Sequence, residues 1–101
     1  VLVGGNCGVY EGTIVRRRAV LAAGTILTRS TPVYDVPRQT IHRATENAPL
    51  VIPEDAVVVP GSRAFAAGAG KDWNLSVYTP VIVKYRDSKT DARIQLEDLL
   101  R

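Results

Sequence analysis

The chain has 101 residues, of which 46% are apolar and 23% charged, a balance that excludes a disordered tail and predicts a packed domain. No stretch approaches the roughly 20 apolar residues of a membrane-spanning helix, so we expect no membrane partner. Thirteen Lys and Arg residues against ten Asp and Glu residues give a formal charge of +3. The basic residues are scattered and only 6% of residues are aromatic, which argues against nucleic acid as a partner.

The chain contains one cysteine and one histidine, Cys7 and His42. One cysteine cannot form an internal disulfide, and the pair cannot complete a metal cage. We therefore expect a reducing compartment, the cytoplasm, and no metal site. The sequence has no Met, even at position 1, and begins inside a repeating pattern. We interpret it as a piece of a longer protein.

A six-residue period runs through the first third of the chain. Counted from Val3, the blocks are VGGNCG, VYEGTI, VRRRAV, LAAGTI and LTRSTP. The first column is aliphatic throughout and consists of Val3, Val9, Val15, Leu21, Leu27 and Val33. The fifth column holds only small residues, namely Cys7, Thr13, Ala19, Thr25 and Thr31. Short repeats of this kind stack copies of one unit, and each copy buries the apolar face that its neighbour leaves open.

A prism-shaped coil explains both columns. If each block is a short strand plus a corner, the first-column side chain points inward and stacks on the next coil. The fifth column must be small because it enters the narrow interior near a corner. Gly4, Gly12 and Gly24 then give the backbone freedom at turns. This is the hexapeptide-repeat pattern, so we predict an all-β fold, a left-handed parallel β-helix that departs from the usual right-handed crossover.

The period stops after Val33 and returns at Ile52. The intervening stretch carries two prolines and several polar residues, which predicts a loop insertion over residues 34–51. Ile52 and Val58 then stand six apart again. We therefore assign residues 1–62 to the coils and their insertion.

Residues 63–101 have a different character. A glycine- and alanine-rich turn comes first, followed by two predicted strands, Leu75–Tyr78 and Val81–Tyr85, on either side of a turn at residues 79–80. The leucines of Gln95–Arg101 share one face of a short helix. We expect a C-terminal β-hairpin and a short terminal helix.

Four segments carry a family resemblance: GGNCGVYEGTIV, LTRSTPVYD, VPGS and NLSVYTPVIVKYRDSKTDARIQLEDLLR. In this order they resemble the C-terminal part of the tetrahydrodipicolinate N-succinyltransferases, which are hexapeptide-repeat acyltransferases. The resemblance implies a homotrimer in lysine and diaminopimelate biosynthesis that moves succinyl from succinyl-CoA to the amino group of a tetrahydrodipicolinate-derived keto acid. It also implies no tightly bound cofactor, active sites between neighbouring subunits, and an N-terminal domain upstream of Val1 that holds further catalytic residues.

Glu11 is the residue to which the resemblance assigns catalysis. The Val-Glu-Gly element of the family matches Tyr10-Glu11-Gly12, whereas the second glutamate that some members carry three residues earlier is Gly8 here. Without the family, the only acidic residue in the first 34 positions could equally be an ion-pair partner of the nearby Arg16–Arg18 run. Both a general-base role and an acyl intermediate stay open for it.

The resemblance also implies where CoA would lie. Backbone at the coil edges would hold the pantetheine, at Ala23, Gly24, Ser62 and Arg63. Lys84 lies in a predicted hairpin strand that the family places close to CoA, although an exposed alternating strand position explains it equally well.

The remaining reactive side chains have simpler interpretations. Cys7 falls in the small inward column, which favours a packed thiol over a nucleophile. His42 is interpreted as a solvated loop residue, with contact to substrate as the alternative. Two other functions stay open: another hexapeptide-repeat acyltransferase that uses acetyl-CoA, and a trimeric β-helix that only binds or scaffolds. A metal hydratase on this fold would need several histidines, and the chain has one.

Overall fold

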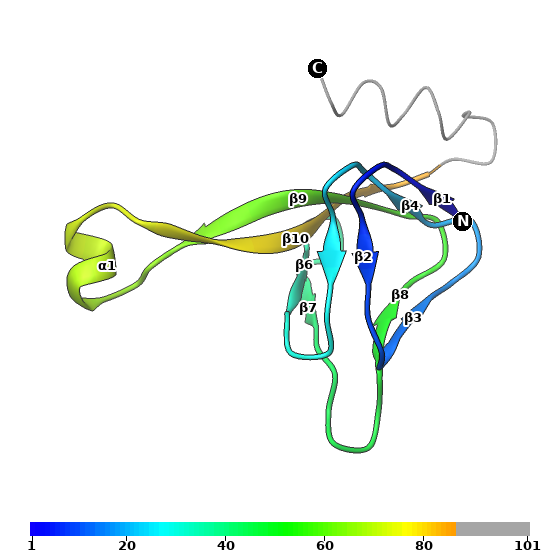
Figure 1. Ribbon diagram of the computed structural model, residues 1–101, viewed down its shortest axis with the longest axis horizontal. Coiled ribbons are helices and arrows are strands. Elements are labelled where there is room, and N and C mark those ends of the chain that lie inside the picture. Colours follow the sequence, from blue (N-terminus) through cyan, green and yellow to red (C-terminus); the bar gives the residue numbers. More distant parts are fainter. Residues whose placement is uncertain (87–101) are drawn as a thin grey trace.

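The computed structural model of the chain describes residues 1–86, and strands dominate this part. Short strands wind into a stacked coil, from which one long hairpin arm projects (Figure 1). The expected all-β character is confirmed for the described residues. No helix among them is long and apolar enough to cross a membrane. The predicted helix Gln95–Arg101 lies outside the described residues.

The strands of the coil are two or three residues long until the last one. In chain order they are β1 (Leu2–Val3), β2 (Gly8–Val9), β3 (Thr13–Val15), β4 (Val20–Leu21), β5 (Ile26–Leu27), β8 (Leu50–Ile52) and β9 (Ala56–Ala64). Strands this short suit a coil that turns a corner once in every hexad.

Parallel pairing sets the length of one coil. Strand β1 pairs with β4 and β2 with β5 at an offset of 18 residues, as in Leu2 with Val20, so three hexads make one coil. Strand β3 pairs with β8 and β4 with β9 at an offset of 37 residues, as in Thr13 with Leu50. The insertion therefore adds 19 residues to one coil without disturbing the stacking on either side. The described strands form stacked coils and do not make a closed helix.

The inserted segment is a β-hairpin rather than the expected loop. Strands β6 (Val33–Asp35) and β7 (Thr40–His42) pair antiparallel, and β6 also pairs in parallel with the arm strand β10 (Ser76–Tyr85). The hairpin forms because β6 finds strand partners on both sides, one of them supplied by a distant part of the chain. Strand β8 rejoins the coil from Leu50.

The arm consists of β9 and β10, which pair antiparallel from Ala56 with Tyr85 out to Ala64 with Ser76. The short helix α1 (Gly68–Asp72) sits at its tip (Figure 1). The predicted turn at residues 79–80 is wrong, because both residues lie in the middle of β10. Pro80 pairs with Pro60, so the two residues that lack a backbone N–H face each other in the ladder.

The first and fifth hexad columns fill the interior, as predicted. The main core cluster consists of Ala19, Leu21, Leu27, Val33, Leu50, Ile52, Ala56, Val58 and Ile82. Thr25 of the small column is fully buried, and its hydroxyl lies 3.5 Å from the carbonyl oxygen of Val58. Val3 and Val9, at the outer end of the stack, are 52% and 47% exposed. Burial in this fold thus depends on having a coil on both sides.

Candidate functional site

Glu11 lies exposed in the turn between β2 and β3. The next residue, Gly12, has a φ of +84°, and its carbonyl oxygen accepts a hydrogen bond of 2.9 Å from the backbone N–H of Leu50. A Cβ at Gly12 would lie 3.1 Å from Cδ of Arg29, so a side chain is disfavoured there on two grounds. The glycine therefore fixes the turn that holds the Glu11 carboxylate in solvent.

Two cavities flank this turn. The larger, of about 570 Å³, is lined by Tyr10, Arg29 and Ala44 among others, and the smaller, of about 240 Å³, is lined by Gly12 and Arg29 among others. The guanidinium of Arg29 donates to the carbonyl oxygens of Thr45 and Glu46 at 3.0 and 3.2 Å, which fixes a wall common to both. Glu11 itself does not line either cavity.

The structure places Ala23 and Gly24 at a corner of the coil next to β9, the strand that carries Ser62 and Arg63. Ala23 and Gly24 form the turn between β4 and β5, and Gly24 has a φ of +83°. A Cβ at Gly24 would lie 4.0 Å from Pro60. Ser62 and Arg63 follow Pro60 on the exposed part of β9. A ligand laid along this corner would meet bare backbone first and polar side chains next.

Tyr78 connects the arm to the same corner, a contact that no sequence pattern indicates. Tyr78 pairs with Ser62 across the arm. Its hydroxyl accepts a bond of 2.7 Å from the N–H of Ile26 and lies 3.3 Å from the carbonyl oxygen of Ile26. Burial raises the pKa of Tyr78, against the opposing effect of the Ile26 N–H. No local pattern could link two residues that are 52 positions apart.

Lys84 is not brought to that corner. It pairs with Val57 beyond a bulge in β10, and it is half-buried. Lys84 lies six positions along β10 from Tyr78, which amounts to roughly 20 Å along the arm.

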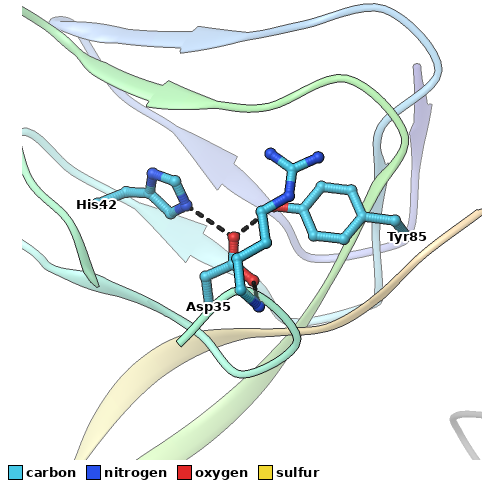
Figure 2. A network of polar contacts seen from close by, with 4 residues as sticks. Asp35, His42 and Tyr85 are labelled. Atoms are coloured by element: carbon cyan, nitrogen blue, oxygen red, sulfur yellow. Dashed lines mark hydrogen bonds and ion pairs between the residues drawn. The ribbon is translucent and has the colours of Figure 1, made fainter. Parts of the chain in front are cut away.

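A buried carboxylate network lies on the inserted hairpin (Figure 2). Asp35 is 2% exposed, and its Oδ2 lies 2.9 Å from Nε2 of His42. The Tyr85 hydroxyl donates to the same oxygen, and the backbone N–H of Arg38 donates to Oδ1 at 3.2 Å. His42 is therefore held by a buried acid, and the interpretation as a solvated loop residue is wrong. Sequence reasoning missed the network because Asp35 and Tyr85 are 50 residues apart.

The hydrogen bonds of the network shift the pKa values of its carboxyl and its phenol in opposite directions. Burial raises the pKa of Asp35, but the hydrogen bonds from His42, Tyr85 and the Arg38 N–H outweigh it, so that the pKa stays below the ordinary 3.8. Burial and the bond to Asp35 raise the pKa of Tyr85 to about 12. The carboxyl is thus ionised and the phenol protonated at neutral pH. The Arg38 guanidinium lies 3.8 Å from the centre of the Tyr85 ring, a cation–π contact.

Cys7 is a packing residue in the structure. It lies against the main core cluster, and its Sγ lies 3.1 Å from the carbonyl oxygen of Ala22. Within residues 1–86, no three side chains of His, Cys, Asp or Glu come together in a way that could hold a metal ion.

The sixfold columns and the 18-residue offset between paired strands are typical of hexapeptide-repeat proteins. In agreement, the family described as "Hexapeptide repeat of succinyl-transferase" matches residues 1–29.

More particularly, the chain is similar over nearly all of its length to proteins named 2,3,4,5-tetrahydropyridine-2,6-dicarboxylate N-succinyltransferase. It is 36% identical over 99 residues to the protein of Acinetobacter baylyi and 39% identical over 102 residues to that of Aromatoleum aromaticum. These matches cover 98% and 100% of this chain but 32% and 33% of the relatives. The resemblance to this family is therefore confirmed, and the chain spans about a third of the length of the curated relatives it matches.

Proposed function

We propose that the chain is part of a CoA-dependent N-succinyltransferase of lysine and diaminopimelate biosynthesis. Its substrates are succinyl-CoA and the amino group of a keto acid derived from tetrahydrodipicolinate. The observation that carries the proposal is the similarity across 98% or more of the chain to relatives of that name. The hexads alone would not suffice, because acyltransferases with other donors and some non-enzymes share them.

The proposed architecture is a left-handed parallel β-helix that carries the β6–β7 hairpin as an insertion and is followed by the β9–β10 arm, with a separate N-terminal domain before the coils. The 18-residue stacking and the small inward column support it. Exposed aliphatic side chains at the outer end of the stack also suit a chain that continues its coil there. The assembly we propose is a cytoplasmic homotrimer with no tightly bound cofactor.

Glu11 is the proposed proton acceptor in this reaction. As the substrate nitrogen attacks the thioester carbonyl, an N–C bond forms, the C–S bond breaks and the nitrogen loses a proton to the carboxylate. That proton then passes to the departing CoA sulfur, so that the products are the succinyl amide and free CoA. The exposed position of Glu11, between residues that line two cavities, supports this role.

CoA is proposed to lie along the corner formed by Ala23, Gly24, Ser62 and Arg63. Gly24 offers a backbone that a pantetheine chain can approach closely, and Arg63 is an exposed cation suited to a phosphate. Lys84 lies at the other end of the strand ladder. In a homotrimer with sites between subunits, we assign Lys84 to the CoA held by the corner of a neighbouring subunit.

Product analysis tests the proposal. The full-length protein is mixed with the amino acceptor and either succinyl-CoA or acetyl-CoA, and mass spectrometry follows free CoA and the new amide. We expect acceptor-dependent release of CoA from succinyl-CoA at a rate at least about tenfold above that from acetyl-CoA, since a site built for the distal carboxylate rejects a donor that lacks it. Preference for acetyl-CoA would favour the acetyltransferase alternative, and no turnover with either donor would favour a scaffold.

A further inference from the structure

A polar cavity of about 600 Å³ lies beside the buried carboxylate network. Its walls include Arg16, Arg38, His42, Glu54 and Asp55. These residues come from the corner after β3, from the inserted hairpin and from the turn between β8 and β9. None of its lining residues belongs to the two cavities at the β2–β3 turn. The cavity is thus separate from the cavities beside the turn that holds Glu11. A ligand in it does not depend on the proposed function.

Among the charged residues that line the cavity, the arginines outside salt bridges outnumber the carboxylates outside them within residues 1–86. Asp55 is neutralised by Arg18, whose Nε lies 3.1 Å from Oδ1 of the carboxylate. Among residues 1–86, neither Arg16 nor Arg38 forms a salt bridge. Glu54 is the remaining carboxylate on the wall, and it is exposed. The wall therefore holds two guanidinium groups and one exposed carboxylate outside the salt bridges of residues 1–86.

The buried network positions two of the cavity side chains in advance. His42 directs Nε2 toward Asp35, so Nδ1 lies on the opposite side of the ring (Figure 2). Arg38 is held over the ring of Tyr85, which is itself bound to Asp35. Side chains fixed in this way lose little freedom when a ligand binds.

We propose that this cavity binds a small oxyanion, a phosphate or carboxylate group, through the guanidinium groups of Arg16 and Arg38, with His42 on the adjoining wall. Guanidinium groups match the geometry of oxyanions through parallel N–H···O bonds, which explains why arginine serves such sites. The volume exceeds what a bare phosphate needs, so the oxyanion would be one end of a larger metabolite. Asp35 is a positioning residue here, since it holds His42 and, through Tyr85, Arg38.

Titration with inorganic phosphate and, separately, with succinate tests the proposal in the full-length protein. The imidazole Cε1–Hε1 resonance of His42, assigned by its loss in His42→Gln, is followed by NMR. We expect a saturable shift with at least one of the two anions, and the tighter one identifies the preferred oxyanion. Arg16→Gln should raise its Kd about tenfold, the cost of one charge-assisted pair. Arg43→Gln, an equal loss of charge at an exposed residue outside the cavity, should leave Kd within about twofold because solvent screens it.

Glu54→Gln provides a test that misfolding cannot imitate. Removal of the Glu54 carboxylate, which forms no salt bridge within residues 1–86, should tighten anion binding by a few-fold. The proposal is overturned if neither anion gives a saturable shift, or if Arg16→Gln and Arg43→Gln weaken binding equally. Weaker anion binding in Glu54→Gln would also overturn it, because the carboxylate would then be helping to form the site.

Discussion

Replacement of Gly4 by alanine should push the first coil away from the second. A Cβ at Gly4 would lie 2.6 Å from the backbone nitrogen of Ala23 and 2.9 Å from its Cα, closer than a Cβ approaches such atoms in folded proteins. The contact atoms are backbone, so no rotamer change relieves the clash. The N–H of Gly4 also donates to the carbonyl oxygen of Leu21 at 2.8 Å, which ties the two backbones together at this point.

Gly5 provides the matched control, because a Cβ there meets nothing within 4 Å. Either change to alanine restricts the unfolded chain, which by itself stabilises by about 0.4–1 kcal/mol. This gain cancels between the two variants. The difference in unfolding free energy between Gly4→Ala and Gly5→Ala therefore reports the overpacking alone, about 1–3 kcal/mol.

Urea unfolding followed by circular dichroism measures this difference. We expect a lower midpoint for Gly4→Ala at an unchanged slope, since the surface exposed on unfolding stays the same. Gly4→Ala and Gly5→Ala variants of equal stability would refute the close stacking of the coils at this corner.

Two further predictions concern the interior and the buried network. Thr25→Phe should destabilise by about 1–3 kcal/mol because Thr25 is fully buried, while Arg17→Phe on the exposed face should be nearly silent. Equal thermal shifts for the two would mean that the sixfold register is wrong. The pKa of Tyr85 is raised to about 12 from 10, so its contribution to stability is complete below pH 10 and is lost as the pH rises toward 12. Urea unfolding across this range should show a loss that is smaller in Tyr85→Phe and unchanged in Tyr10→Phe, and identical curves for all three proteins would contradict the buried phenol.

The coil was predictable from the sequence because its interior repeats every six residues. Equivalent positions in successive coils have the same steric environment. A small residue at position 25 is therefore predictable from its column, without knowing which residues pack against it. The arm has no such repetition. Pro80 is a turn signal in most sequences, yet here it lies within a strand because Pro60 of the partner strand faces it.

The site residues also include some that the sequence could identify and some that it could not. Glu11 could be singled out from the resemblance and from its isolation among apolar and basic residues. The carboxylate network could not, since its acid, its histidine and its phenol lie on three strands that meet only when β10 returns along β6. The β6–β7 hairpin also packs against β10, which is distant in sequence. Residues 34–51 alone therefore indicate only a loop.

The turnover of Glu11→Gln in the full-length protein is the most direct test of the central claim, that this chain supplies the catalytic carboxylate of an N-succinyltransferase. Glutamine keeps the size of the side chain and removes its basicity. At saturating succinyl-CoA and amino acceptor, we expect kcat to fall by about 10²–10⁴-fold. Succinyl-CoA affinity and Tm should match those of Asp72→Asn, a carboxylate removed at the exposed tip of the arm. A Glu11→Gln enzyme that turns over within a few-fold of the wild type would contradict the claim.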